Sequence, residues 1–503
     1  MSDGSKKALE AAEVVRRAGL GALEEGNFDA ALAAFGNAID LLNKNHLKNR
    51  PNYDLARAKL QVDSGKCLLQ LGQLNVALEA FNSAQRFHDL PDLANQPELN
   101  ADRATLQMYR GTCLADLGRL DDALAAYDAA QALQQEPHLA ERPDLDKDRA
   151  RLQNNRGNSL SDLGHLDAAL EAYDIAMMYH QKPYLADLLE LDADRARLQM
   201  NRGSCLLKLG RLADALVAYD TALAYHDKPH LADRPEHDAE RARLQINRGS
   251  CLLKLGRLAD ALVAYDTALH YYQKPQLVER LELDDDRASL HLNRGICLRQ
   301  LGRLNEALAA FDSALVYHQS RNLTGRPELD VDRAKVQVNR GNALSDLGQF
   351  ENASLAYSQA EHLYDENKLA MHPSYLVELG RLLLNKARMN AQLGNSENAF
   401  DLLKSAHSSL KRSGLSDTGV MILRAVVQEE QGELCVADGS NHQAITFFEH
   451  SLDVLNSASD AGRDQVVYII ARVSNKLARL YLQMDEHEKA IAVLDRVADN
   501  VSE

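Results

Sequence analysis

One stretch occurs twice in this chain, letter for letter: residues 201–223 and residues 247–269 both read NRGSCLLKLGRLADALVAYDTAL. The copies start 46 residues apart, and weaker copies continue at the same step in both directions. A fixed period of this length is typical of a repeat architecture. We number each repeat from its third residue, position 0. Position 0 is occupied by Gly19, Gly65, Gly111, Gly157, Gly203, Gly249, Gly295, Gly341, Ala387, Gly432 and Ala478.

Each of these eleven repeats reads as two helices. A second glycine stands at +7, from Gly26 to Gly439, with Asp485 in the last repeat. Glycine enters the left-handed conformation without a Cβ penalty, so it should end the first helix. Alanine fills +12 in all eleven repeats, an aromatic residue fills +16 in nine, and alanine recurs at +19. We expect the glycine at position 0 to face the alanine at +12, with the ring filling the gap beside them.

This spacing of Gly, Gly, Ala, aromatic and Ala resembles the tetratricopeptide repeat (TPR) family over essentially the whole chain. The resemblance implies an all-α, right-handed α-solenoid (superhelix) of eleven tandem TPR-like helical hairpins, with the first helices lining a concave face. The period is 12 residues longer than the usual 34, and segments such as 226–244 hold the extra residues. We interpret them as a longer first helix plus a Pro-bounded loop, since all eleven prolines fall between hairpins.

The repeats also divide the chain by regularity. Residues 1–386 hold regular TPR-like repeats, about eight of them plus the start of the ninth. Residues 387–503 hold diverged C-terminal repeats that should continue the same solenoid, since the register of position 0 persists to Ala478.

The composition excludes several classes of function. With 57 Lys and Arg against 73 Asp and Glu, the net charge is −16, which disfavours nucleic acid and anionic membranes. The N-terminus has no secretory signal, and no stretch reaches the roughly 20 apolar residues of a membrane span. The six cysteines are not set at metal-ligand spacings. We therefore expect a soluble cytoplasmic protein without a metal or other cofactor.

Two polar rows on the first helices are the candidate binding residues. Position −2 carries asparagine in six consecutive repeats: Asn155, Asn201, Asn247, Asn293, Asn339 and Asn385. One helical turn earlier, position −6 carries Arg151, Arg197, Arg243, Lys335 and Arg381. In related TPR proteins these positions face the concave groove, where asparagines grip a peptide backbone and basic residues bind carboxylates. An amide can both donate and accept. The alternative is that the asparagines are only inherited by duplication.

Acidic residues weaken the case for a dedicated carboxylate site. Asp148, Asp194, Glu240 and Asp332 precede four of the basic residues by three positions, the spacing of a helix-surface ion pair. A mixed polar groove is the better interpretation.

Other periodic residues are better explained by structure. Arginine at −1 and aspartate at +17 recur together, which predicts an ion pair between helices. Five cysteines share position +2, where serine and alanine also occur, so this site needs a small buried side chain. The histidines at +23 (His88, His180, His226 and His318) should cap second helices as cations and pack the following loops.

The sequence therefore predicts a non-catalytic scaffold or adaptor that holds an extended segment of a protein or peptide partner in its groove. No nucleophile–base pair, phosphate loop or zinc signature argues for an enzyme. The alternative function is a ligand- or peptide-sensing TPR regulator that changes curvature on binding. Homodimerisation, end-to-end or isologous, stays open.

Overall fold

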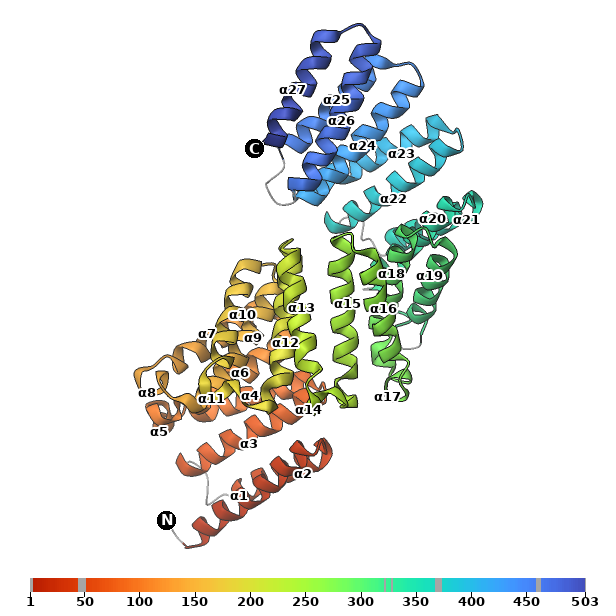
Figure 1. Cartoon of the computed structure of the whole chain (residues 1–503). Coiled ribbons are helices and arrows are strands. Elements are labelled where there is room, and N and C mark those ends of the chain that lie inside the picture. Colours follow the sequence, from red (N-terminus) through yellow and green to blue (C-terminus); the bar gives the residue numbers. More distant parts are fainter. Residues whose placement is uncertain are drawn as a thin grey trace. The chain divides into compact units, whose positions relative to one another are not determined.

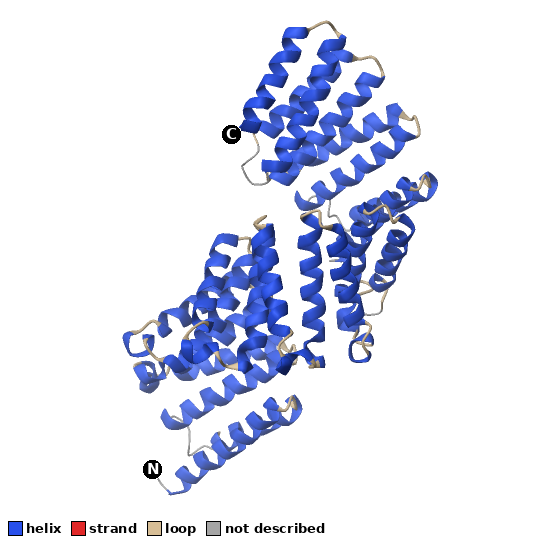
Figure 2. Cartoon of the chain, viewed as in Figure 1, coloured by secondary structure: helices blue, strands red, loops and turns tan. Residues whose placement is uncertain are grey.

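The computed structural model describes residues 3–43, 51–320, 323–326, 329–366, 373–457 and 463–502. Over these residues the chain forms eleven helical hairpins and no strand, which confirms the predicted α-solenoid (Figure 1, Figure 2). The first helices are α1 (Asp3–Glu24), α3 (Pro51–Gln70), α6 (Asn100–Asp116), α9 (Asp146–Asp162), α12 (Asp192–Lys208), α15 (Asp238–Lys254), α18 (Asp284–Gln300), α20 (Asp330–Asp346), α22 (Pro373–Gln392), α24 (Thr418–Ala437) and α26 (Arg463–Gln483). The second helices are α2 (Phe28–Leu42), α4 (Leu74–His88), α7 (Leu120–Gln134), α10 (Leu166–His180), α13 (Leu212–His226), α16 (Leu258–Tyr272), α19 (Leu304–His318), α21 (Phe350–Glu366), α23 (Ser396–Arg412), α25 (Asn441–Asn456) and α27 (His487–Ser502).

The chain has two compact parts, residues 1–234 and residues 235–503. Repeats 1–5 lie in the first part and repeats 6–11 in the second. The change from regular to diverged repeats that we predict at residue 387 falls inside the second part and stays a prediction.

The glycine at +7 has the backbone conformation that the sequence predicts. Gly210, for example, has φ +76° and ends α12. The last repeat keeps the same turn with Asp485 at φ +59°, a conformation that an L-residue adopts only at a cost.

The glycine at position 0 lies against the aromatic ring at +16. A Cβ on Gly203 would lie 2.7 Å from Cε1 of Tyr219, the ring at +16, and the same ring contact recurs in the other repeats that have glycine and an aromatic residue at these positions. The ring thus lies directly on the glycine, as predicted, whereas the approach of the alanine at +12 stays a prediction. Where position 0 is Ala387 or Ala478, position +16 is leucine, Leu403 or Leu494. The smaller side chain leaves room for the added methyl group.

The long period comes mainly from ordered connectors. In repeats 3–8 the first helix has 17 residues and the second, in repeats 3–7, has 15. At the five junctions from repeats 2–3 to repeats 6–7, a four-residue helix is followed by a 3₁₀ turn, so the predicted loop is in fact structured there. The short helices are α5 (Pro91–Ala94), α8 (Pro137–Ala140), α11 (Pro183–Ala186), α14 (Pro229–Ala232) and α17 (Pro275–Val278), and the turns are η2 (Pro97–Leu99), η3 (Pro143–Leu145), η4 (Leu189–Leu191), η5 (Pro235–His237) and η6 (Leu281–Leu283). Each described proline is the first residue of a helix or turn, where its missing N–H costs nothing.

A buried polar network fixes each connector to its first helix. Asp192, at the start of α12, accepts a hydrogen bond from Arg195 at 2.6 Å. Arg195 in turn donates to the carbonyls of Leu185 and Leu188 in the preceding connector. Lys228, from the next connector, reaches the same Asp192 carboxylate at 2.9 Å. We call this three-residue network the connector staple.

The connector staple recurs with one instructive change. Asp146, Arg149 and Lys182 repeat it in full. In the preceding junction Asn100 replaces the aspartate, and it donates at 2.7 Å to Glu136, which replaces the lysine. The paired replacement keeps the hydrogen bond while removing one charge and reversing the other, so the two positions act as a unit.

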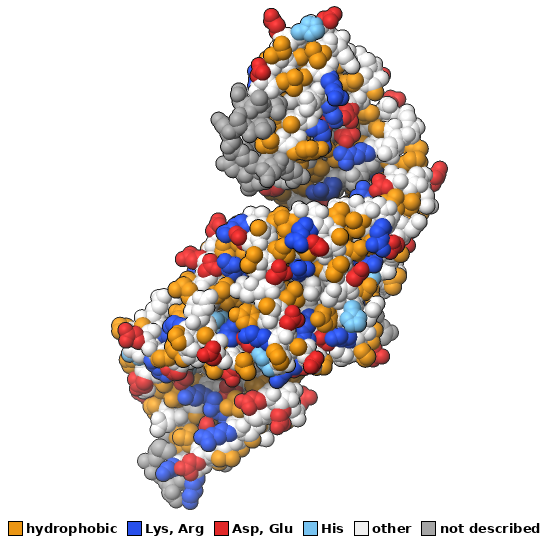
Figure 3. Space-filling model, in the orientation of Figure 1, with side chains coloured by type: hydrophobic (Ala, Val, Ile, Leu, Met, Phe, Trp, Pro, Cys, Tyr) orange, Lys and Arg blue, Asp and Glu red, His pale blue; other side chains and the backbone are white. Residues whose placement is uncertain are grey.

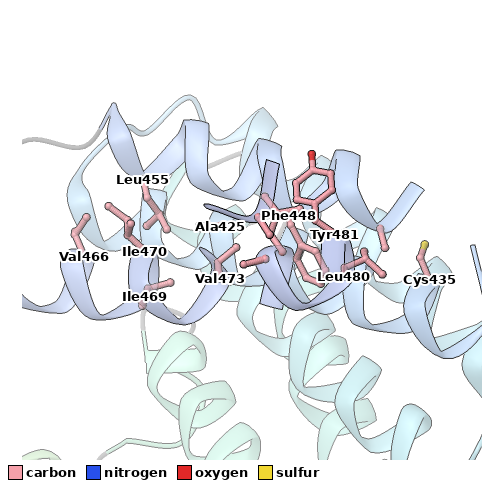
Figure 4. Close-up of a cluster of buried hydrophobic side chains, with 14 residues drawn as sticks. Ala425, Cys435, Phe448, Leu455, Val466, Ile469, Ile470, Val473, Leu480 and Tyr481 are labelled. Carbon is pink, nitrogen blue, oxygen red and sulfur yellow. The ribbon is translucent and has the colours of Figure 1, made fainter. Parts of the chain in front are cut away.

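Apolar side chains of neighbouring repeats pack together in shared clusters. Figure 4 shows this in the last two repeats, where Val473 and Leu480 of α26 pack with Phe448 of α25. Val473 stands at position −5 of its own repeat yet belongs to the core of the repeat before it. Leu60, Leu106, Leu152 and Leu382 do the same at their junctions. Each repeat therefore depends on its neighbour for burial of apolar surface.

Candidate functional site

Three of the predicted binding residues meet around one cavity. Arg151 and Asn155 of α9 and Arg197 of α12 line a hollow of about 180 Å³ in the first part of the chain. Lys147, Asn154, Asn158, Asp194 and His180 complete its polar lining. We call this hollow the polar cavity.

The remaining predicted residues lie on other first helices and do not line the polar cavity. All six asparagines at −2 are half-buried, and so is Lys335, whereas Arg151, Arg197, Arg243 and Arg381 are exposed. The structure thus places the two rows on accessible surface and gathers them into a cavity at α9 and α12.

Sequence reasoning missed Lys147, Asn154 and Asn158. They stand on the same face of α9 as Arg151, at spacings of three, four and seven residues, which a helix brings together. The signal was present in the stretch 147–158, but Lys147 does not recur in the other repeats, and Asn154 and Asn158 each recur only once, as Asn475 and Asn342. A search for periodic positions therefore passes over them.

The basic residues are held by acids, as the mixed-groove interpretation predicts. Arg151 pairs with Asp148 at 2.6 Å, and its guanidinium lies 5.0 Å from the ring centre of Tyr109. Arg197 lies 3.6 Å from Asp194. In the second part Lys335 pairs with Asp332 at 2.9 Å. These contacts orient the cations without burying them, since the pairs are exposed or half-exposed.

Arg243 departs from this pattern. It pairs at 2.7 Å with Asp286, which belongs to the next repeat. A three-residue spacing alone therefore does not decide which acid holds a given cation. On the face shown in Figure 3, Lys and Arg side chains adjoin Asp and Glu side chains along the chain, in keeping with a mixed polar surface.

Two of the asparagines at −2 make hydrogen bonds to the preceding repeat. Asn155 Nδ2 donates to Thr112 Oγ1 at 3.1 Å, and Asn201 Nδ2 donates to Asn154 Oδ1 at 3.2 Å. Asn339 instead donates to the carbonyl of Lys335 in its own helix at 2.8 Å. Each amide keeps one further N–H, and the oxygen of Asn155 accepts no hydrogen bond from the described residues, so Asn155 can still both donate to and accept from a bound peptide.

His180 lines the polar cavity from a buried position. Only 8% of the residue is exposed, and its Nδ1 has no hydrogen-bond partner among the described residues. Burial and the nearby Arg195 lower the pKa of His180, so the neutral ring predominates at neutral pH. The histidines at +23 are packed, as predicted, and burial lowers the pKa of His88, His180 and His318, which disfavours the cationic form that the predicted capping would use.

The arginines at −1 are structural, as predicted. Arg202 binds Asp174 of the preceding second helix at 2.7 Å, and Arg156, Arg294 and Arg340 make equivalent pairs with Asp128, Asp266 and Asp312. Arg110 donates instead to Asn82, which replaces the aspartate. These arginines join successive repeats.

The cysteines are buried packing residues. Cys205 Sγ donates to the carbonyl of Leu166, at the start of the preceding second helix, at 3.2 Å. Burial raises the pKa of Cys113 to about 11, so it carries no reactive thiolate at neutral pH. In the part of the chain that the structure describes, no group of three His, Cys, Asp or Glu side chains could hold a metal ion.

Replacing Cys205 with alanine, which copies Ala343 at the same position, should cost only about 1 kcal/mol through one weak hydrogen bond and a small loss of packing. A denaturant melt of the variant measures this cost. Metal analysis of the purified wild-type chain should find no stoichiometric zinc. Stoichiometric zinc that disappears in the Cys205→Ala variant would contradict the packing role.

Comparisons with known proteins agree with the repeat pattern. Residues 62–137, 154–230 and 264–322 match one sequence profile of the tetratricopeptide repeat, and residues 471–499 match another. No curated protein matches the chain. None of the described helices is long and apolar enough to cross a membrane.

Solved structures resemble the chain in fold. The apo form of RapI is 13% identical, with 82% of this chain and 98% of that chain covered and a TM-score of 0.54. A Rap protein complexed with competence and sporulation factor is 16% identical over 79% of this chain and 97% of that one, with a TM-score of 0.47. Yeast Tom70 is 15% identical over 97% and 92%, with a TM-score of 0.42. At these identities the likeness concerns the fold alone.

Proposed function

Because the chain belongs to the tetratricopeptide repeat family, we propose that it is a non-catalytic scaffold or adaptor that binds an extended segment of a partner protein along its first helices. The observation that carries the proposal is the polar cavity, where Arg151, Asn155 and Arg197 converge. A fold alone does not determine function, so the proposal depends on this site.

The polar cavity offers the chemistry that an extended segment needs. Asn155 supplies a donor and an acceptor for a peptide bond, and Arg151 and Arg197 supply oriented cations for an acidic side chain. Asp148 and Asp194 balance those cations, so the site suits a segment with mixed charge better than a polyanion. We also place the protein in the reducing cytoplasm, in keeping with six free cysteines that are all buried.

A displayed library of random peptides, selected on the full chain, tests this function. We expect enriched peptides that lose at least about 100-fold in affinity for the variant Arg151→Ala/Asn155→Ala/Arg197→Ala, because charge-assisted hydrogen bonds contribute roughly 1.5–3 kcal/mol each. Calorimetry or fluorescence anisotropy on the selected peptides measures the loss.

The matched control is Arg119→Ala/Arg211→Ala. Arg119 pairs with Asp122 and Arg211 with Asp214 at the same three-residue spacing, both at 2.6 Å, outside the polar cavity. This control should bind as the wild type does. Selected peptides that bind the triple variant with unchanged affinity would show that the polar cavity is not the binding site. A change in small-angle scattering on peptide binding would favour the alternative function, a regulator that changes curvature.

A further inference from the structure

We infer that the second part of the chain binds a phosphate group, at four basic side chains that α23, α24 and α25 bring together. The group is inorganic phosphate or the phosphate of a phosphorylated side chain. The polar cavity lies in the first part, so the inference goes beyond the proposed function and does not depend on it. The four residues are His407, Lys411, Arg424 and His450.

Arg424 stands at −8, where the arginine of other repeats is bound by a residue of its own helix. In repeats 2 to 8 the arginine at −8 donates to an aspartate or asparagine at −11, as Arg195 does to Asp192. In repeat 10 position −11 is Met421, a buried apolar residue. Arg424 is half-buried, and it makes no ion pair or hydrogen bond with any described residue. Since no described carboxylate neutralises this guanidinium, an external anion would stabilise it.

Helical spacing and one hydrogen bond bring three of the basic groups together. Lys411 follows His407 by four residues on α23, and Gln428 follows Arg424 by four residues on α24, so each pair shares a helix face. Gln428 Nε2 donates to His407 Nδ1 at 2.9 Å, which joins the two faces. Because Nδ1 accepts this hydrogen bond, a neutral His407 carries its proton on Nε2 and can donate it to an anion.

The charged groups that act on His407 are all basic. Burial is the largest cause that lowers the pKa of His407, and the other causes are Arg424 of α24, Lys411 of α23 and His450 of α25. Over the residues that the structure describes, neither Lys411 nor His450 has an acidic partner within ion-pair distance. This cluster therefore differs from the polar cavity, where acids hold the arginines.

The unpaired polar atoms favour phosphate over a carboxylate as the ligand. Nε of Arg424 is a donor and Oε1 of Gln428 is an acceptor, and both are buried without a hydrogen-bond partner among the described residues. Phosphate has acceptor oxygens and, in its protonated forms, a hydroxyl donor, whereas a carboxylate only accepts. A phosphate monoester also carries a charge of about −1.5 to −2 at pH 7, which suits several basic groups better than a single charge does.

Calorimetric titration of the full chain with sodium phosphate, at pH 7 and constant ionic strength, tests the inference. Phosphate should bind at one site per chain with a Kd of about 1 mM or below, and sodium acetate should bind much more weakly. Arg424→Met should weaken phosphate binding about 10- to 100-fold, because it removes charge-assisted hydrogen bonds. Titration with O-phosphoserine separates the two sources, since tighter binding than that of inorganic phosphate indicates a phosphorylated side chain as the natural ligand.

Two further variants and one control sharpen the test. Met421→Asp supplies the acid that most of the other repeats carry at −11, so an internal carboxylate should compete for Arg424 and weaken phosphate binding. Lys411→Ala/His450→Gln should also weaken binding, and it changes only exposed side chains, so the fold should be unaffected. The control is Arg303→Met, because Arg303 pairs with Glu306 at 2.6 Å outside the cluster. It should bind phosphate as the wild type does.

Hydrogen exchange locates the site. Phosphate should increase protection in α23 and α24 of the wild type and leave α18 and α19 unchanged. A wild type that binds no phosphate, or that binds acetate as tightly, would overturn the inference. Unchanged phosphate binding by Arg424→Met would do the same. If circular dichroism shows that Arg424→Met is not folded, unchanged binding by the exposed double variant decides against the site instead.

Discussion

Replacing Asp192 with alanine should destabilise repeat 5 by about 3–5 kcal/mol, because removal of one partner leaves a buried charge without compensation. Asp192 is fully buried, and Arg195 is nearly so. Burial alone would raise the pKa of Asp192, but hydrogen bonds from Lys228 and Arg195 hold it below its ordinary value. Loss of the carboxylate would also free Arg195 from the connector that it binds.

Hydrogen exchange is the suitable measurement, because repeats in a solenoid can open locally while the rest stays folded. Protection should fall in residues 183–208 and much less in repeats 1 and 2. Lys228→Met should cost only about 1 kcal/mol or less, since the lysine is half-exposed.

Another junction of the chain suggests a second substitution that should compensate for the loss of the Asp192 carboxylate. Asp192→Asn/Lys228→Glu copies the Asn100–Glu136 pair of an earlier junction. The double variant should regain much of the protection that Asp192→Asn alone loses, giving a favourable coupling in a double-mutant cycle. If the two changes simply add, the connector staple is not a unit and the paired replacement in the sequence is a coincidence.

The hairpins could be predicted from the sequence, whereas the connector staple could not. Position 0, +7, +12 and +16 repeat along the chain, so a periodic search finds them directly. Asp192 and Lys228 are 36 residues apart in segments that look like polar surface loops. Only the packing of one repeat on the next brings them together and buries the carboxylate.

The candidate site could be predicted only in part, because only some of its residues recur with the repeat. The rows at −2 and −6 were visible as a period, and their exposure on first helices agrees with that reading. The polar cavity also depends on Lys147, Asn154 and Asn158, whose residue types recur at most once at their positions in the other repeats. Which acid holds a cation also depends on reach in space, as Arg243 shows by pairing with Asp286 of the next repeat.

Gly203→Ala should destabilise its hairpin by about 1–3 kcal/mol through overpacking, although alanine is the better helix former. The new Cβ would lie 2.7 Å from Cε1 of Tyr219, closer than two carbon atoms can approach. Tyr219 is fully buried and cannot move aside freely. The control is Gly36→Ala on α2, where a Cβ meets nothing within 4 Å and should stabilise the helix by up to about 1 kcal/mol.

The diverged repeats suggest a change that should compensate for Gly203→Ala. In them, alanine at position 0 accompanies Leu403 or Leu494 at +16. Tyr219→Leu alone should destabilise, because it leaves a void over glycine. Combined with Gly203→Ala, the void and the added methyl group should partly cancel, so the double variant should be more stable than the sum of the single changes predicts. Denaturant melts and hydrogen exchange over α12 and α13 measure this coupling. Strict additivity would mean that the backbone shifts to accommodate the methyl group, and that the ring-on-glycine contact is not what selects glycine at position 0.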